Sequence, residues 1–336
     1  MSRKIRWGIL SPAAIGLKKV IPGMQLSELC DIAAIASRDL GRAQAAAKQL
    51  GIRKAYGSYD ELLADPDIDA IYNPLPNDLH VFWSIKAANA GKHVLCEKPI
   101  ALSADEAKQL IAVRDRTGVK MCEAFMVRTH PQWMLAREIV KSGQLGRITS
   151  IASFFSYFNR DPNNIRNSTA QGGGALMDIG CYPITQTRYL LGEEPMKVIA
   201  MLDRDPDFGT DRCSSAMMQF PSAQATFTCG TQVVPYQRMI VFGTTSRLEI
   251  QIPFNAPPGH ACKLFVDSGK ELAGAAAVTT EAAPCDQYTL QGDHFSRAIL
   301  DGTEVAVPLE DALNNMAVID ALFRSAKSGH WESPTI

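Results

Sequence analysis

Between residue 4 and about residue 122, short β-branched runs alternate with longer segments whose apolar residues recur at helical spacing. Such alternation is typical of βαβ units, in which helices join successive parallel strands. The pattern predicts strands at residues 5–10, 31–37, 70–74, 93–97 and 120–124. It predicts helices at residues 43–50, 59–64, 80–90 and 104–117. We therefore expect a doubly wound α/β domain with a parallel sheet in residues 1–124.

After residue 124 the pattern changes and strand-like segments dominate. A helix is predicted at 131–141, a strand at 148–157, a polar loop to 174 and a helix to about 191. Further strands are predicted at 198–202, 214–220, 224–230, 238–243 and 247–252, and late helices at 288–301 and 309–327. This order favours an α+β domain in residues 125–336 with an open, mainly antiparallel sheet. Two domains also suit 336 residues, because single cores seldom grow beyond about 250–300 residues.

Composition narrows the possible partners. Lys and Arg total 34 against 35 Asp and Glu, so the formal charge of -1 provides no global attraction for nucleic acid or an anionic membrane. The start of the chain lacks the apolar run of a signal peptide, and no stretch approaches 18 uninterrupted apolar residues. We expect a cytoplasmic protein. The eight cysteines form no CxxC pair and the six histidines no HxxxH pair, which favours free thiols and no metal.

The first predicted strand runs into the turn Ser11-Pro-Ala-Ala-Ile-Gly16. This turn stands where dinucleotide-binding proteins carry G-x-G-x-x-G, and here only the third glycine is present. Small residues at 11 and 13 would let a pyrophosphate approach the backbone, and free N–H groups at a helix start favour its charge. An ordinary strand-to-helix turn remains equally compatible. The candidate cofactor-binding residues are Ser11, Ala13, Ala14 and Ile15.

The second predicted strand ends in Ser37-Arg38, and Arg42 follows one helical turn later. Sites that prefer NAD usually place an acidic residue here, where it accepts hydrogen bonds from the ribose hydroxyls. Ser37, Arg38 and Arg42 instead favour the 2′-phosphate of NADP. Asp39 keeps NAD open, and solvated arginines at a helix start would look the same.

Two further segments leave the carboxyl ends of predicted strands, where open α/β sheets bind ligands. Lys98 follows one strand within Glu97-Lys98-Pro99, and the turn from Tyr72 to His80 follows another. Prolines fix this turn, which suits a rigid wall for a ribose or nicotinamide and equally a tight structural loop. The candidate cofactor-binding residues here are Tyr72, Pro74, Leu75, Asn77, His80, Glu97, Lys98 and Pro99.

Together with later motifs, these segments resemble the Gfo/Idh/MocA oxidoreductase family over nearly the whole chain. The later motifs are Arg128-Thr-His130-Pro, Asn164-Ile-Arg166 and Gly172-Gly-Gly-Ala-Leu-Met-Asp178-Ile-Gly-Cys-Tyr182-Pro. The spacing between Glu-Lys-Pro and the glycine-rich motif is highly specific for the family. Many members carry histidine where this chain has Tyr182. The tyrosine form resembles the subgroup of glucose–fructose oxidoreductase, dimeric dihydrodiol dehydrogenase, xylose dehydrogenase and sugar ketoreductases.

The resemblance implies hydride transfer between NADP and a sugar or cyclic diol, with Lys98, Asp178 and Tyr182 as catalytic residues. A phenol has an ordinary pKa near ~10, and a nearby ammonium such as that of Lys98 would lower this pKa. Tyr182 would then exchange the proton of the alcohol or carbonyl. If residues 175–191 are helical, Asp178 lies one turn before Tyr182 and would orient the substrate hydroxyl or Lys98. Pro183 must then kink the helix or lie near its start.

The resemblance also implies the substrate-binding residues, with Arg166 near the cofactor as well. They are Lys98, Arg128, His130, Phe158, Arg160, Arg166, Asp178 and Tyr182. The preferred hypothesis is an NADP-dependent aldose dehydrogenase, or an aldose–aldose oxidoreductase that retains its cofactor. Alternatives are a deoxysugar ketoreductase, a trans-dihydrodiol dehydrogenase and a non-catalytic NADP-binding regulatory protein. A homo-oligomer, either dimer or tetramer, is expected from the family's open sheet.

Overall fold

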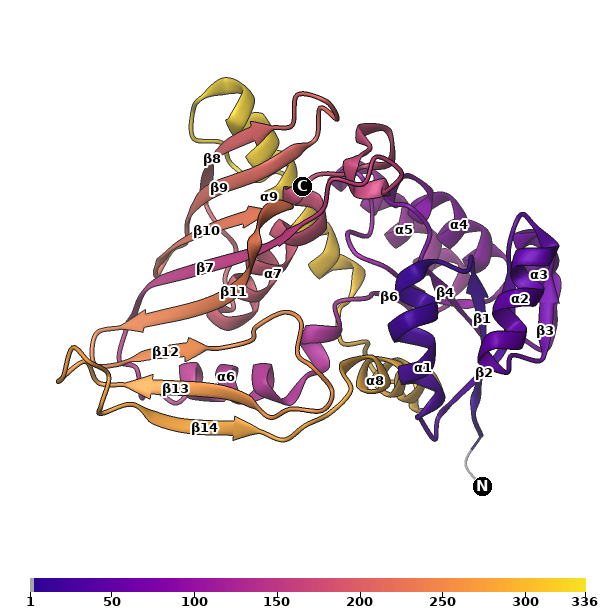
Figure 1. Ribbon diagram of the computed structural model, residues 1–336, viewed down its shortest axis with the longest axis horizontal. Coiled ribbons are helices and arrows are strands. Elements are labelled where there is room, and N and C mark those ends of the chain that lie inside the picture. Colours follow the sequence, from indigo (N-terminus) through magenta and orange to yellow (C-terminus); the bar gives the residue numbers. More distant parts are fainter. Residues whose placement is uncertain (1–2) are drawn as a thin grey trace. The chain divides into compact units, whose positions relative to one another are not determined.

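The computed structural model describes residues 3–336 and divides the chain into two compact units (Figure 1). The first unit comprises Met1–Thr129 and Asp286–Leu313, and the second comprises His130–Cys285 and Asn314–Ile336. The functional division at residue 124 stays a prediction, and the compact units differ from it because residues 286–313 join the first unit. Within residues 3–336, no helix has the length and apolar character needed to cross a membrane.

The first unit is built on a six-stranded parallel sheet with the order β3-β2-β1-β4-β5-β6. Its strands are β1 (Ile5–Leu10), β2 (Cys30–Ala36), β3 (Lys54–Tyr56), β4 (Ala70–Asn73), β5 (His93–Cys96) and β6 (Met121–Glu123). The central strands are buried along nearly their whole length, as expected of a parallel sheet covered on both faces. The doubly wound prediction is confirmed, and β3 is the strand that the pattern missed.

The helices of this unit are α1 (Ile21–Gln25), α2 (Leu40–Leu50), α3 (Tyr59–Ala64), α4 (Asn77–Asn89), α5 (Ala104–Thr117) and α8 (Gln287–Asp301). The first five lie between successive strands of the sheet, whereas α8 follows β14 in the chain and packs against α1. The side chains of Asp39, Ser58 and Ser103 accept hydrogen bonds from backbone N–H groups in the first turns of α2, α3 and α5. α2 and α4 begin three residues earlier than predicted, because each of their first turns has a single leucine among polar or small residues, which is too few apolar residues to show helical spacing.

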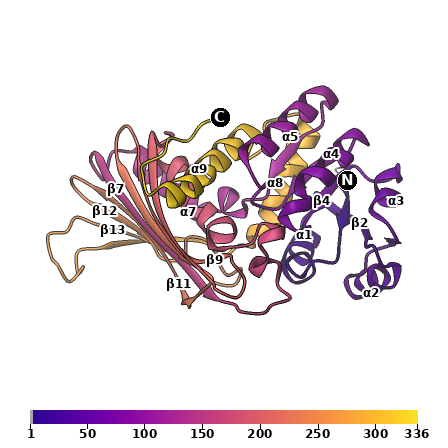
Figure 2. The same ribbon diagram turned by 90° about the horizontal axis from the view of Figure 1, so that it is seen from above.

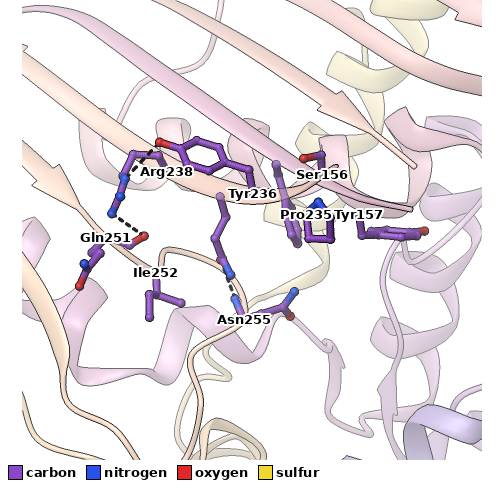
Figure 3. A pocket seen from close by; sticks show the side chains of 10 residues that line it. Ser156, Tyr157, Pro235, Tyr236, Arg238, Gln251, Ile252 and Asn255 are labelled. Carbon is purple, nitrogen blue, oxygen red and sulfur yellow. Dashed lines mark hydrogen bonds between the residues drawn. The ribbon is translucent and has the colours of Figure 1, made fainter. Parts of the chain in front are cut away.

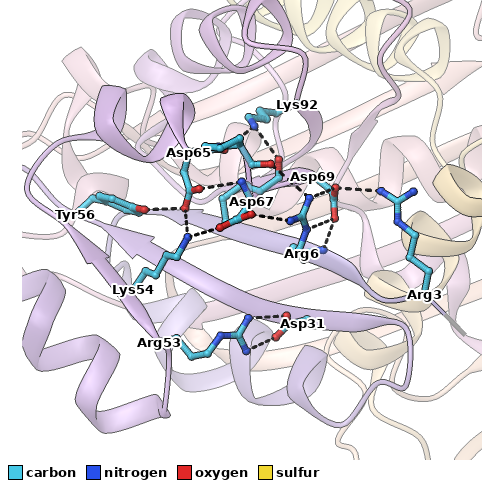
Figure 4. A network of polar contacts seen from close by, with 12 residues as sticks. Arg3, Arg6, Asp31, Arg53, Lys54, Tyr56, Asp65, Asp67, Asp69 and Lys92 are labelled. Carbon is cyan, nitrogen blue, oxygen red and sulfur yellow. Dashed lines mark hydrogen bonds and ion pairs between the residues drawn. The ribbon is translucent and has the colours of Figure 1, made fainter. Parts of the chain in front are cut away.

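A network of charged side chains occupies the amino edge of this sheet, where the parallel strands begin (Figure 4). Arg6 pairs with Asp69 at 2.9 Å, Lys54 with Asp65 at 2.9 Å, and Arg53 with Asp31 at 2.7 Å. The buried Lys92 donates from Nζ to the backbone oxygens of Asp65 and Ile68, each at 2.8 Å. We call this set, Arg6, Asp31, Arg53, Lys54, Asp65, Asp69 and Lys92, the amino-edge network. Lys92 binds backbone oxygens, and the other members pair as cation with carboxylate, which indicates a structural role.

The second unit is built on an eight-stranded sheet with the order β14-β13-β12-β11-β7-β10-β9-β8. Its strands are β7 (Ile148–Phe158), β8 (Lys197–Arg204), β9 (Asp211–Gln219), β10 (Gln224–Gly230), β11 (Gln232–Gly243), β12 (Arg247–Ile250), β13 (Cys262–Asp267) and β14 (Val278–Ala282). Every pair is antiparallel except β7 with β10, so the predicted open, mainly antiparallel sheet is confirmed. β13 and β14 were not predicted.

The helices of this unit pack on one face of the sheet, and among the described residues of this unit no helix covers the other face (Figure 2). They are α6 (Pro131–Lys141), α7 (Cys181–Leu191) and α9 (Leu309–Ser328), the last belonging to this unit from Asn314 onward. A π-helical turn, Leu176–Gly180, immediately precedes α7. Pro183 is the third residue of α7 and follows closely on this turn, so the irregularity of the helix lies beside a residue that has no N–H to donate.

Candidate functional site

The turn after β1 has the backbone geometry that its sequence only partly predicts. Ser11 adopts a φ of 79°, and its N–H donates to the backbone oxygen of Ala36 at 2.9 Å. This left-handed conformation is usually occupied by glycine, because a Cβ atom disfavours it. Helical backbone begins at Ala14 and continues into the π-helical turn Gly16–Val20. The tight turn therefore forms without the first glycine of the fingerprint, at the position predicted for pyrophosphate.

After β2, the acidic and basic side chains are used differently. The Asp39 carboxylate accepts a hydrogen bond from the backbone N–H of Arg42 at 3.2 Å and so caps α2. Ser37 is buried, and its hydroxyl accepts a hydrogen bond from the N–H of Asp39 at 3.2 Å. Arg38 and Arg42 are both exposed. Cations accessible to a phosphate are thus present, while the one nearby carboxylate already has a partner.

The ends of β4 and β5 are joined by polar side chains. The Tyr72 hydroxyl donates to Oε1 of Glu97 at 2.7 Å, and burial raises the pKa of Tyr72 well above its usual value. Asn73 accepts from the N–H of Leu75 at 3.3 Å and donates to the backbone oxygen of His80 at 3.1 Å. Asn73 was not among the predicted residues. A polar side chain inside a buried strand was the signal that could have identified it.

His80 holds the turn after β4 against the segment that follows Lys98. Its ring nitrogens lie 2.8 Å from the backbone oxygen of Pro99 and 2.7 Å from that of Leu75. The ring is fully buried, and this burial lowers its pKa. Because protein encloses the ring, His80 acts on the proposed cofactor site through the two loops that it joins. The Lys98–Pro99 peptide bond is cis, and Asn77 begins α4.

In the second unit, Asp178 is the centre of a polar cluster. Tyr157 donates its hydroxyl proton to Oδ2 of Asp178 at 2.6 Å, and Nε of Arg166 donates to the same oxygen at 2.8 Å. The charge of Asp178 raises the pKa of Arg166, while burial and this same charge raise the pKa of Tyr157. We call these three residues the Asp178 cluster. The sequence predicted that Asp178 orients the substrate hydroxyl or Lys98, and it missed both the Arg166 pairing and Tyr157.

Tyr182 lies in the first turn of α7, and its side chain is fixed by aromatic packing. Its ring centroid is 5.7 Å from that of Phe155, at an interplanar angle of 82°, and 5.6 Å from that of Phe254. Only 5% of Tyr182 is exposed. Asp178 lies within the π-helical turn that leads into α7, so Asp178 and Tyr182 belong to one continuous helical segment. Lys98 belongs to the other unit, where it follows β5.

The remaining predicted substrate residues have partners of their own. In the first unit, Nη1 of Arg128 pairs with Oδ2 of Asp311 at 2.8 Å. In the second unit, Arg160 pairs with Asp207 at 2.6 Å, and the side chain of Phe158 is largely exposed. Within residues 3–336, neither Arg160 nor Phe158 forms a hydrogen bond or ion pair with the Asp178 cluster. Arg160 fits the prediction of a polar surface loop, whereas Phe158 is the last residue of β7 and does not belong to the loop.

His130 begins the second unit and caps α6. Its Nδ1 accepts a hydrogen bond from the N–H of Gln132 at 3.2 Å, and its Nε2 lies 3.3 Å from Sγ of Cys285. Burial lowers the pKa of His130 to about 4, so the ring is neutral at pH 7. The cysteines, Cys285 included, are free thiols. Residues 3–336 contain no group of three or more His, Cys, Asp or Glu side chains arranged to hold a metal ion.

Comparison with known proteins matches both halves of the chain to one family. Residues 5–125 match the model described as "Oxidoreductase family, NAD-binding Rossmann fold", and residues 133–249 match the GFO/IDH/MocA C-terminal domain. An uncharacterized oxidoreductase of Rhizobium meliloti is 49% identical over 98% of this chain and 99% of its own length. D-xylose 1-dehydrogenase (NADP(+)) 2 of Haloferax volcanii is 40% identical over 96% of this chain and 98% of its own.

A solved structure extends this likeness to three dimensions. The 3-ketoreductase of Actinomadura kijaniata, in complex with NADP and TDP-benzene, has a TM-score of 0.90 and 30% sequence identity to this chain. The match covers 96% of this chain and 98% of that one. The similarity therefore extends over both units rather than over the dinucleotide-binding half alone.

Proposed function

We propose, from the premise that the chain belongs to the GFO/IDH/MocA oxidoreductase family, that it transfers a hydride between NADP and an aldose. The observation that carries this proposal is the Asp178 cluster. An ionised carboxylate with two fixed donors stands just before the buried phenol of Tyr182 in the helical segment. Such a pair suits a substrate hydroxyl, which needs one group to orient it and another to exchange its proton.

The residues at the carboxyl edge of the six-stranded sheet fit NADP by the chemistry of their donors. Backbone N–H groups of the turn from Ser11 to Gly16 would hold the pyrophosphate, and Arg38 and Arg42 the 2′-phosphate. Asp39, the residue that would favour NAD, already caps α2. When bound, NADP supplies the hydride acceptor for alcohol oxidation or the hydride donor for carbonyl reduction.

The protein's own groups handle the proton. Tyr182 takes the proton from the substrate hydroxyl during oxidation and returns it to the carbonyl oxygen during reduction. The ammonium of Lys98 stabilises the phenolate form of Tyr182 by its charge. Arg166 keeps the Asp178 carboxylate ionised and aimed, so that it accepts a hydrogen bond from a neighbouring hydroxyl of the sugar.

D-Xylose is the first substrate to test, because the Haloferax volcanii relative is a D-xylose 1-dehydrogenase. A deoxysugar ketoreductase is the second candidate, favoured by the likeness to the Actinomadura kijaniata 3-ketoreductase. An absorbance scan of the purified protein, followed by addition of xylose without external cofactor, distinguishes free from retained NADP. A spectral change under these conditions supports the retained-cofactor form.

Tyr182→Phe tests the catalytic assignment. We expect NADP to bind normally, while single-turnover hydride transfer falls by about 10²- to 10⁴-fold, as is usual when a general acid or base is lost. Stopped-flow absorbance of the reduced nicotinamide measures the rate, and fluorescence titration measures the affinity. Full activity in this variant would contradict the assignment of Tyr182 as the proton-transfer residue.

A homo-oligomer through the uncovered face of the eight-stranded sheet belongs to the same proposal. Met201 is 76% exposed and Met217 is 43% exposed on β8 and β9. Exposed apolar side chains of this size favour contact with a second copy. Light scattering of the wild type and of a Met201→Lys variant tests the contact, and an unchanged mass in the variant would argue against it.

A further inference from the structure

A pocket of about 460 Å³ opens in the second unit between β7, β11 and the segment after β12 (Figure 3). Its walls come from residues 155–157, 235–238, 251, 252 and 255. Its volume lies within the range of about 300–1,000 Å³ that small-molecule sites span. No residue named so far for the cofactor lies in it.

An irregularity in the sheet creates this pocket. The pairing of β11 with β7 shifts register between Gln232 and Tyr236, and Pro235 within this stretch has no N–H to donate. The hydroxyl of Ser156 instead donates to the backbone oxygen of Val234 at 2.6 Å. The two strands thus stay connected while the ladder between them is interrupted. Bulges of this kind are frequent beside active sites.

The walls are fixed before any ligand arrives. Oε1 of Gln237 accepts hydrogen bonds from the N–H groups of Phe254 and Asn255, at 2.9 and 3.0 Å. Nη1 of Arg238 donates to the backbone oxygen of Gln251 at 3.0 Å. These bonds tie the segment after β12 to β11, so the pocket is preorganised.

Its chemistry suits a neutral polyhydroxylated ring. Tyr157 and Tyr236 supply aromatic surfaces, and Gln251 and Asn255 supply side-chain amides that form no hydrogen bond within residues 3–336. Amides both donate and accept, as sugar hydroxyls do. The one cation in the lining, Arg238, lies 3.3 Å from Glu249 and is therefore already balanced. A diphosphate would require unbalanced positive charge, which the pocket does not offer.

Tyr157 connects this pocket to the proposed reacting centre. The residue lines the pocket, and its hydroxyl donates to Asp178 at 2.6 Å. The side chain of Tyr157 therefore lies between the pocket and a sugar ring held by Asp178. We propose that the pocket binds the second ring of a neutral disaccharide whose first ring reacts at Asp178, an inference that rests on the proposed function. The substrate class is then short neutral saccharides rather than nucleotide-linked sugars.

Steady-state kinetics with NADP test this with D-xylose and with xylobiose, which has the same reducing end and one further ring. We expect kcat/KM to be about tenfold higher for xylobiose, since each new hydrogen bond contributes about 0.5–1.5 kcal/mol. Gln251→Ala and Asn255→Ala should each return the ratio of the two kcat/KM values toward one. Gln144→Ala, an exposed position outside the pocket, is the matched control and should keep the ratio of the wild type.

The outcomes separate this inference from the proposed function. Turnover of xylose with no preference for xylobiose, and no effect of the pocket variants on the ratio, overturns the inference and leaves the proposed function intact. If neither sugar is turned over, the proposed function fails. Calorimetric titration of xylobiose then tests whether the pocket binds a saccharide independently of turnover. Binding that Gln251→Ala weakens supports a saccharide site, and the absence of binding overturns it. Tighter binding of dTDP-glucose than of xylobiose, lost in Arg238→Ala, would overturn the neutral class.

Discussion

At the amino edge of the six-stranded sheet, charged side chains are paired with one another, whereas at the carboxyl edge two arginines stay exposed. Arg6 pairs with Asp69, and Lys54 with Asp65, each at 2.9 Å. After β2, by contrast, Asp39 caps a helix and leaves Arg38 beside it exposed. Both edges use the same residue types. The difference shows that a site for an anionic ligand is recognised by the charge left over after internal pairing, rather than by the number of charges.

The largest expected effect at the carboxyl edge is that of Lys98→Ala. If Lys98 has the proposed role, removal of its ammonium should slow single-turnover hydride transfer by about 10²- to 10⁴-fold. Lys54→Ala, at the amino edge, is the matched control, because Lys54 pairs with Asp65. It should lower stability and leave the rate of the folded enzyme unchanged. Stopped flow measures the rate in both variants. Equal losses of rate would contradict the proposal that the carboxyl edge is functional and the amino edge structural.

Arg38→Ala is expected to have the next largest effect. A hydrogen bond to a charged group contributes about 1.5–3 kcal/mol, so the Kd for NADPH should rise by about 10- to 100-fold. The Kd for NADH should change much less, because NADH has no 2′-phosphate. Fluorescence titration of both cofactors measures the two values. A similar loss for both would show that Arg38 does not bind the phosphate.

Asp65→Asn examines the amino-edge network through its pH dependence. Hydrogen bonds from Tyr56 and Lys54 outweigh burial and lower the pKa of Asp65 to about 2. Since this folded-state pKa lies below the unfolded value, Asp65 contributes stability above about pH 4, and that contribution is lost as pH falls toward 2. Wild type should exceed the variant by roughly 1–2 kcal/mol at pH 7 and by about half as much at pH 3. Urea unfolding measures the difference, and a constant difference from pH 7 to 3 would contradict this account.

Arg53→Gln should have the smallest effect. Arg53 is 62% exposed and pairs with Asp31, and exposed pairs contribute about 0.2–1 kcal/mol. The loss in unfolding free energy should shrink when the NaCl concentration is raised, because salt screens exposed charges. Urea unfolding at low and high salt provides the measurement. A loss that persists at high salt would mean that this pair is not a simple surface contact.

Much of the fold was predictable because its strands are either buried runs or separated by regular helices. β13 and β14 differ in the signal that their sequences carry. β13 alternates, with Cys262, Leu264 and Val266 buried, so its pattern was present in the sequence and was overlooked. β14 lies at the sheet edge and is mostly exposed, so its sequence carries almost no apolar pattern. Such strands are defined by pairing with a neighbour, which a local pattern does not show.

The residues of the candidate site likewise divide into those that a local sequence pattern predicts and those that depend on contacts distant in the sequence. Ser11, Arg38 and Lys98 were identified because each immediately follows a strand, and position along a strand is local information. The partnership of Tyr157 with Asp178 joins residues 21 positions apart, one in β7 and one in the π-helical turn. Residue periodicity predicts neither the turn nor the pairing, because a π-helical turn has the same composition as an α-helical one.

The π-helical turn Leu176–Gly180 changes the helical phase between the residues before it and the residues after it. An α-helix advances by about 100° per residue, so one extra residue in a turn rotates everything before it by about that angle relative to everything after it. Deleting one residue here would re-aim Asp178 while leaving Tyr182 and its aromatic neighbours in place. Under the proposed function, one residue gained or lost at this turn would therefore direct Asp178 toward a different hydroxyl of the substrate and keep Tyr182 in place.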